Sequence, residues 1–168
     1  MGRIVLETLE PRDRWAVQAL LRACGEPASA ARGLLTSDPT RASSIRGELL
    51  GMTDPTTREL VGLIDLRAHC PDPETLTVQL FLVSPFHVEG PVAEQAWQRL
   101  EARAAALGMR RARVEVTADS WSTLRFWQAA GFVAEPEPIR DRGRLVVVFE
   151  KPLIRCRIDG DHLLTSSP

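Results

Sequence analysis

The chain has 168 residues, of which 44% are hydrophobic and 26% are charged, and its formal net charge is −1. This length fits a single globular domain, and the composition excludes an intrinsically disordered or fibrous protein. The nearly neutral charge excludes a general nucleic-acid binder, because there is no surplus of cations to release counterions from phosphates.

No apolar run reaches the roughly 20 residues that a membrane-spanning helix needs, and the N-terminal segment lacks a secretory hydrophobic stretch. We therefore expect a cytoplasmic protein that does not bind membranes. The three cysteines, Cys24, Cys70 and Cys156, are odd in number and widely spaced. This pattern indicates reduced thiols rather than a disulfide framework.

The N-terminal part of the chain predicts a strand followed by a helix. Residues 3–9 alternate weakly between apolar and polar side chains, which is typical of a strand, and residues 13–24 form a helical stretch that ends at Gly25. Residues 28–44 are rich in Ala, Ser, Arg and Pro. We expect a short helix and a loop in that segment.

The central part predicts a hairpin, a strand and a long helix. Residues 45–52 and 59–68 are strand-like and are separated by a turn of the Asp-Pro kind. A further strand covers residues 76–83. Residues 91–107 then show a helical apolar face, with a glycine, Gly108, placed to cap the C-terminal end.

The C-terminal part predicts a strand, a short helix and a last hairpin. Residues 113–117 are strand-like, and a helix begins near Ser120 and ends at Gly131. Residues 132–137 and 144–152 predict the two strands of the hairpin. No internal repeat and no low-complexity linker interrupts this order.

Several stretches between residues 80 and 132, namely LFLVSP, GPVA, ALG and VEVTADSWSTLRFWQAAGF, resemble the GCN5-related N-acetyltransferase (GNAT) superfamily. The resemblance implies an α/β fold with a mixed, twisted sheet of about six or seven strands and helices on both faces. It predicts one acyltransferase domain over residues 1–155, followed by a C-terminal tail over residues 156–168. It also implies that acetyl-CoA, or another acyl-CoA, binds as cosubstrate.

In the GNAT family, a loop with the pattern Gln/Arg-x-x-Gly-x-Gly/Ala binds the pyrophosphate of the cofactor. The aligned residues here are Val88, Glu89, Gly90, Pro91, Val92 and Ala93. Only Ala93 fits the pattern, because Gly90 comes one residue early. Since Pro91 removes a backbone donor and Glu89 adds a carboxylate, we expect binding weakened on the order of a thousandfold. A helix start without any phosphate role is the alternative interpretation.

The resemblance also implies where acyl transfer takes place. The backbone N–H groups of Leu82 and Val83 are expected to stabilise the oxyanion and to bind the pantetheine arm. Thr77 occupies the strand position where family members often carry a carboxylate base, and its hydroxyl cannot act as a base at neutral pH. The nearby acids that remain as candidates are Glu48, Asp65 and Glu74.

The family places an Asn, and seven residues later a Tyr, on the helix before the final Gly-Phe. Ser120 and Trp127 stand at those two positions, and Thr123 lies between them as a further expected cofactor contact. The chain contains no tyrosine. Because an indole does not ionise in the useful range, Trp127 cannot act as general acid. It is then either an aromatic wall beside the pantetheine arm or a core residue.

No metal site is expected from the sequence. His69 and Cys70 are adjacent but lack further ligands at zinc spacing. Asp159 and Asp161 resemble the start of a calcium loop without its later ligands.

Two functional hypotheses follow from these residues. The first is an acyl-CoA-dependent N-acyltransferase, with acetyl as the expected group, in which a primary amine of a small molecule or peptide attacks the thioester directly. The second is a GNAT-fold binding or partner module that has lost catalysis and does not use acetyl-CoA, as the altered loop and the missing Asn and Tyr suggest. An unrelated α/β protein is a third alternative. A homodimer through an exposed sheet edge is a further expectation.

Overall fold

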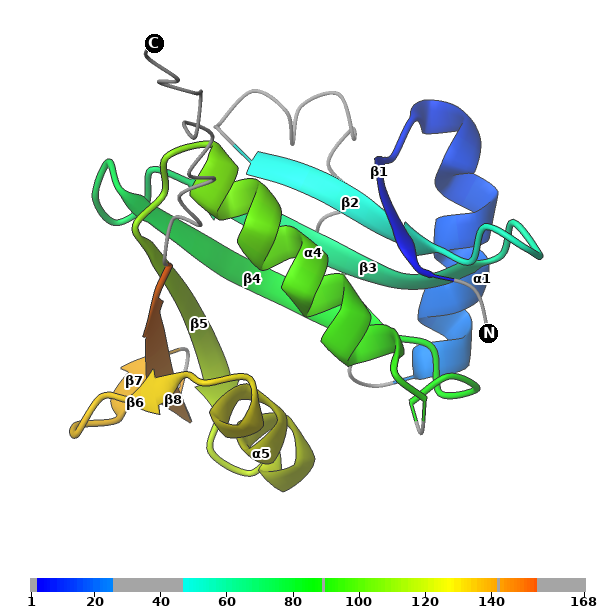
Figure 1. Cartoon of the computed structure of the whole chain (residues 1–168). Helices are drawn as coiled ribbons and strands as arrows, with labels where there is room; N and C mark the ends of the chain where they lie inside the picture. The colour runs from blue at the N-terminus through cyan, green and yellow to red at the C-terminus, as the bar shows by residue number, and fades with distance from the viewer. Residues whose placement is uncertain (1–2, 26–46, 89, 142, 154–168) are drawn as a thin grey trace, which may run out of the picture.

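The computed structural model describes residues 3–25, 47–88, 90–141 and 143–153 (Figure 1). Its elements in chain order are β1 (Val5–Thr8), η1 (Pro11–Asp13), α1 (Arg14–Cys24), β2 (Gly47–Thr53), β3 (Leu60–Ala68), β4 (Thr75–Val83), α4 (Val92–Ala106), β5 (Arg111–Thr117), α5 (Trp121–Ala129), β6 (Val133–Ala134), β7 (Ile139–Asp141) and β8 (Arg144–Pro152). The segment 28–44 and the tail 156–168 lie outside the described residues. None of the described helices is long and apolar enough to cross a membrane.

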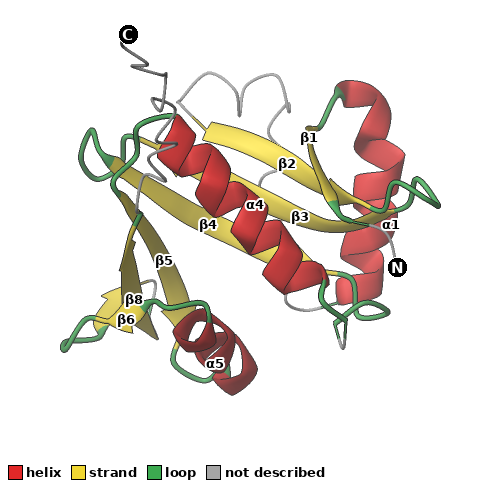
Figure 2. Cartoon of the chain, viewed as in Figure 1, coloured by secondary structure: helices red, strands yellow, loops and turns green. Residues whose placement is uncertain are grey.

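The strands form one mixed sheet in the order β1-β2-β3-β4-β5-β8-β6, and β7 also pairs with β8. Among the strands of the described ranges, β4 and β5 are the parallel pair, and α4 makes the crossover between them. Figure 2 shows α1 and α4 on opposite faces of the sheet, with α5 beside the C-terminal end of β5. This arrangement confirms the predicted α/β class with helices on both faces.

Two apolar cores lie on the two faces, because successive side chains of a strand point in opposite directions. The larger core lies beneath α4 and α5 and includes Val78 of β4 and Leu100 of α4. The smaller core lies beneath α1, where Leu63 and Leu82 pack near Leu20. β4 therefore contributes side chains to both layers.

The predicted ends of the two C-terminal helices are confirmed. Gly108 and Gly131 have φ angles of 88° and 89°, in the left-handed region where glycine carries no steric penalty. After Gly131, the N–H group of Phe132 donates to the Trp127 carbonyl at 3.0 Å. Leu107, which the helical pattern placed on the apolar face, lies past the end of α4 and is 68% exposed.

The last hairpin differs from the sequence expectation. In place of one strand over residues 132–137, two short strands, β6 and β7, pair with different parts of β8. The interruption contains Pro136 and Pro138, which lack a backbone donor and are poorly suited to a continuous ladder.

Candidate functional site

A β-bulge in β4 marks the place where β4 leaves β5. Asp65 and Leu66 of β3 pair with Leu80 and Val78 of β4, so Gln79 is the extra residue in the register. The parallel ladder with β5 also ends at Val78. A bulge bends its strand and increases the local twist, which accounts for the separation. Figure 1 shows β4 and β5 diverging toward the start of α4 and toward α5, and we call this part the splayed end.

The backbone of β4 in the splayed end has donors that the sheet does not use. Ser84 donates its N–H to the Val61 carbonyl at 2.8 Å, which fixes the alternation of the antiparallel ladder with β3. By that alternation Leu82 points its N–H toward β3, whereas Phe81 and Val83 point theirs toward the splayed side. The Val83 N–H therefore lies on the side expected for an oxyanion donor, whereas the Leu82 N–H is directed at β3. Phe81, which the sequence pattern did not single out, also has its N–H on the splayed side.

The described residues of the loop between β4 and α4 offer few backbone donors. Gly90 donates its N–H to a carbonyl of the same turn at 3.1 Å, and Pro91, the N-cap residue of α4, has no N–H. The first helical bond runs from the Gln95 N–H to the Pro91 carbonyl at 2.9 Å. The N–H groups of Val92 and Ala93 precede that bond and have no acceptor within the helix. They are the part of the predicted loop that is suited to an anion.

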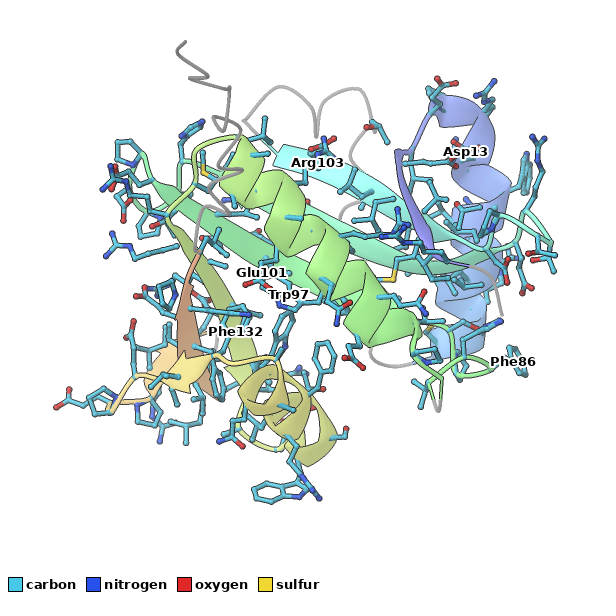
Figure 3. The ribbon with its side chains drawn as sticks, in the orientation of Figure 1. Asp13, Phe86, Trp97, Glu101, Arg103 and Phe132 are labelled. Atoms are coloured by element: carbon cyan, nitrogen blue, oxygen red, sulfur yellow. The ribbon has the colours of Figure 1, made fainter. Side chains whose placement is uncertain are left out.

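The other described residues near this turn offer little to a phosphate. Val88 is 64% exposed and carries no polar group, and Glu89 lies outside the described residues. Glu94 adds a carboxylate to the first turn of α4. This charge interacts favourably with the helix dipole but repels a phosphate. Phe86 is 83% exposed and points away from the sheet (Figure 3).

The predicted contacts on α5 lie at its first turn. Ser120 is the N-cap residue, and its hydroxyl donates to the Thr123 hydroxyl at 2.7 Å. Both residues are partly exposed. α5 follows β5 in the chain, so its first turn, with Ser120 and Thr123, lies at the β5 side of the splayed end. They can hydrogen-bond to amide groups of a ligand there.

Trp127 is 1% exposed and lies at the centre of a cluster of aromatic rings. Its ring centroid lies 5.2 Å from that of Phe81, 5.0 Å from Phe126, 5.5 Å from Trp97 and 4.9 Å from Phe132. We call these five residues the aromatic cluster. It joins the splayed part of β4 to α4 and α5 through apolar contacts. Trp127 is thus a core residue.

Two of the three candidate bases are already paired. Glu48 accepts hydrogen bonds from the Arg103 guanidinium at 2.8 and 3.0 Å, on the face of the sheet that α4 covers. Glu74 lies on an exposed turn and pairs with Arg110 at 3.1 Å, at the end of the sheet where β4 and β5 are still hydrogen-bonded. Neither carboxylate lies at the splayed end.

Asp65 is the remaining candidate, and it is only 9% exposed. It stands directly opposite Leu80, the first residue after the bulge, and it shares the α1 side of β3 with Leu63. Burial raises the pKa of the Asp65 carboxyl, while Arg67 and the Leu66 N–H act in the opposite direction. A carboxylate with a raised pKa is a better proton acceptor than an ordinary aspartate.

The described cysteines and histidines form no metal site. Cys24 and Cys70 are free thiols, and burial raises the pKa of the Cys24 thiol. Its sulfur lies 3.8 Å from the Val83 carbonyl oxygen. The His69 ring nitrogen Nδ1 contacts the Pro73 carbonyl. Within the described ranges, no group of three or more His, Cys, Asp and Glu side chains is placed to hold a metal ion.

Lys151, the sole lysine of the chain, joins three elements in a way that the sequence pattern did not predict. Its ammonium lies 2.7 Å from Glu101 Oε1 on α4 and donates to the Ala130 carbonyl after α5 at 2.8 Å. It also lies 5.6 Å from the ring centroid of Trp97. Figure 3 shows Trp97 and Glu101 on the side of α4 that faces α5 and β8.

No model of a known protein family matches the sequence, and no curated protein matches it either. Solved structures do match. An acetyltransferase from Thermus thermophilus is 21% identical, with a TM-score of 0.71 over 91% of this chain and 100% of that chain. A GNAT-family acetyltransferase from Staphylococcus aureus is 9% identical, with a TM-score of 0.70 over 90% of this chain and 99% of that chain.

A third structure is the spermidine N-acetyltransferase from Vibrio cholerae in complex with CoA and spermine. It is 16% identical, with a TM-score of 0.71 over 90% of this chain and 96% of that chain. The matches extend over nearly the whole of each chain. The chain therefore has the fold of the GNAT acetyltransferases.

Proposed function

We propose that this protein is an acyl-CoA-dependent N-acyltransferase, with acetyl as the expected group, that acts on a primary amine. The observation that carries the proposal is the splayed end, where the ladder stops at Val78 and the strand beyond it turns two N–H groups outward. The structural neighbours that are acetyltransferases, including one solved with CoA and spermine, support it.

The residues present fit an acyl-CoA in part. The backbone of Phe81 and Val83 offers an extended edge to an amide-containing arm, and the first-turn N–H groups of Val92 and Ala93 offer a place for phosphate. Ser120 and Thr123 offer hydroxyls on the facing side. Bound acyl-CoA supplies the thioester carbonyl that the amine attacks. With so few phosphate donors, we expect weak binding.

The chain's own groups define the proton path. The Val83 N–H stabilises negative charge on the attacked carbonyl oxygen. Asp65 accepts the proton of the amine through water. It is chosen because it stands opposite Leu80, the first residue of β4 after the bulge, and because neither of the other two candidate acids lies at the splayed end. No general acid is needed for the leaving thiol, since a thiolate with a pKa near 8.5 leaves readily.

Calorimetric titration with acetyl-CoA, dephospho-CoA and desulfo-CoA tests the cofactor assignment. We expect saturable binding of all three, because the contacts named above involve the pantetheine amides and the pyrophosphate. Release of free thiol from acetyl-CoA in the presence of simple primary amines then tests catalysis. Absence of binding at millimolar acetyl-CoA would reject the proposal.

A binding module without catalysis is the second candidate, and the aromatic cluster favours it. Trp127 fills the position of the family's acid with a buried indole, and Phe81 packs directly against it. A module of this kind would bind neither acetyl-CoA nor its analogues and would release no thiol with any amine. The homodimer and the cytoplasmic location remain predictions from the sequence.

A further inference from the structure

A groove of about 170 Å³ lies between the C-terminal half of α4 and the strands β3 and β4. Its walls are buried apolar side chains, namely Leu66, Leu76, Leu100, Ala104 and Met109. Apolar cavities of this order of size hold a ligand as large as one benzene ring. We call this hollow the α4 groove, and none of the residues assigned to acyl transfer lines it.

The charged side chains that line the α4 groove are paired with each other. Arg103 donates to both carboxylate oxygens of Glu48, at 2.8 and 3.0 Å. His69 contributes an exposed ring, whose Nδ1 contacts the Pro73 carbonyl. Leu107 also lines the groove and is 68% exposed, so a large apolar side chain stands at its mouth. The groove therefore suits an apolar side chain better than a charged ligand.

The chain leaves its last strand next to the α4 groove. The Leu153 N–H donates to the Arg110 carbonyl at 2.8 Å, one residue after Met109 in the groove wall. Leu153 is 6% exposed and belongs to the apolar core that also contains Met109 and Leu100. The backbone therefore arrives at residue 154 on the face of the sheet that α4 covers, beside the groove.

The sequence after Leu153 carries apolar side chains at a suitable distance, namely Ile154, Ile158, Leu163 and Leu164. Ile154 is bonded directly to Leu153 and has almost no reach of its own. Ile158 can lie up to roughly 16 Å from Leu153, whereas the groove follows only about 10 Å of α4 between Leu100 and Leu107. Ile158 is thus the first apolar residue of the segment that reaches the whole groove, and its short connection costs less entropy to close than a longer one.

We propose that residues 154–168 dock on the α4 groove of their own chain, with the Ile158 side chain in the hollow and against Leu107. Attachment through a few residues gives the segment an effective concentration at the groove in the millimolar range or above. A separate molecule has no such advantage, so the segment of the same chain is the occupant that the geometry favours. The docked segment covers Leu107 and extends the apolar core. This inference does not depend on the proposed acyl transfer.

Methyl NMR of the full chain tests the position of Ile158. With the methionine and isoleucine methyl groups labelled with carbon-13, we expect a nuclear Overhauser effect between the methyl group of Met109 and the δ-methyl group of Ile158. Met52, buried in β2 outside the groove, is the internal control and should show no such contact.

Two results of the NMR measurement would overturn the proposal. The first is a Met109 methyl group without any contact to Ile158. The second is a contact that persists in a mixture of chains labelled only on methionine with chains labelled only on isoleucine, because a second copy would then occupy the groove.

Two substitutions in the full chain measure the energetic consequence by urea denaturation. Ile158→Ser should raise the equilibrium constant of unfolding about tenfold, because the docked chain loses a buried apolar side chain. Leu163→Ser is the matched control, since it removes an apolar side chain of the same segment outside the proposed contact, and it should have little effect. Equal effects of the two substitutions would contradict the assignment of Ile158.

A double-mutant cycle between Ile158 and Leu107 tests whether the two side chains touch. Leu107→Ser should destabilise the wild type several times more, as a ratio of unfolding constants, than it destabilises the Ile158→Ser variant. Strict additivity of the two substitutions would show that they do not touch and would reject the docked arrangement.

Discussion

The two ends of the β4–β5 pair are held together in different ways. At the end that starts with Thr75, a short parallel ladder is extended by polar links, in which Arg110 and Arg111 donate their N–H groups to the Glu74 carbonyl at 2.8 and 3.2 Å. Arg111 also pairs with Asp72 at 2.6 Å. At the splayed end the ladder between the two strands has stopped, and the aromatic cluster packs against Phe81 of β4 in the core on the α4 face. We call the first of these the closed end.

The comparison shows that two strands of a sheet can separate and still be held together by side-chain packing. Buried rings replace the missing hydrogen bonds between strands by apolar contacts, which need no fixed register. This leaves the Phe81 and Val83 N–H groups of β4 unpaired with β5. The closed end should therefore respond to pH and salt, and the splayed end to changes of side-chain volume.

The largest expected effect is that of Trp127→Ala. Removing this buried ring should lower the free energy of unfolding by about 3 to 5 kcal/mol, measured by urea denaturation. Trp121→Ala, at a position that is 71% exposed on the same helix, is the control and should change stability by less than about 0.5 kcal/mol. Similar losses for both variants would mean that the aromatic cluster does not hold the splayed end.

Asp65→Asn sharpens the functional side of the comparison. If Asp65 accepts the amine proton, the rate of acyl transfer should fall about a hundredfold or more, and the wild-type rise of rate with pH should disappear. Acetyl-CoA affinity should stay the same, because Asp65 does not contact the cofactor in the proposed arrangement. A pH–rate profile identical to that of the wild type would remove Asp65 from the mechanism.

The same variant should be more stable than the wild type at neutral pH. Burial raises the pKa of Asp65 in the folded state, so the charged carboxylate is disfavoured there. The loss of folding stability caused by burying this charge is absent below the unfolded-state pKa of 3.8. It appears as the pH rises through the raised folded-state pKa. Urea denaturation at pH 7 and below pH 3.8 should show a gain of stability at pH 7 only. A gain in stability together with a loss of rate excludes unfolding as the cause.

Pro91→Gly tests whether the start of α4 faces phosphate. The substitution adds a backbone N–H, and one such donor to a charged group should tighten acetyl-CoA binding by roughly tenfold. Calorimetric titration measures the change, and Pro138→Gly, in the connection between β6 and β7, is the control. Unchanged affinity would place the phosphates away from this turn.

The smallest expected effect belongs to the closed end. The Thr75 hydroxyl, the Glu74 N–H and the Arg111 guanidinium lower the pKa of Asp72. Asp72→Asn should therefore reduce stability slightly at neutral pH, and the difference should vanish as the pH falls below 3.8 through the lowered pKa of the folded state. Thermal unfolding at pH 7 and at low pH checks the direction. A difference that persists at low pH would show that the charge of Asp72 is not responsible.

The local sequence was sufficient to predict most of the secondary structure. The helix α4 follows from its apolar face and Gly108, and the strands β3 and β4 follow from strand-like stretches bounded by turn signals. The same local signals failed at β6 and β7, where Pro136 and Pro138 interrupt the strand. Resemblance of short motifs to the GNAT superfamily then supplied the fold, which the structural matches support.

The site was less predictable, because its properties depend on register. Which of Leu82 and Val83 presents an N–H to the splayed end follows from the alternation that Ser84 sets with Val61, and not from the residue types. Likewise, Glu48 and Asp65 are both acids on neighbouring strands, yet one faces Arg103 and the other lies buried on the opposite face. A single shift of register would exchange these roles.

By itself, then, the sequence determined the order of the elements and the apolar faces, since periodicity and caps act over a few neighbouring residues. Tertiary structure alone decided that Trp127 is enclosed by rings from β4, α4, α5 and the turn after α5, that Lys151 joins α4 to the end of α5, and that Asp65 is buried beside the bulge. Those facts depend on contacts between residues far apart in the chain, and their pairing is fixed only when the sheet register and the packing of the helices are formed together.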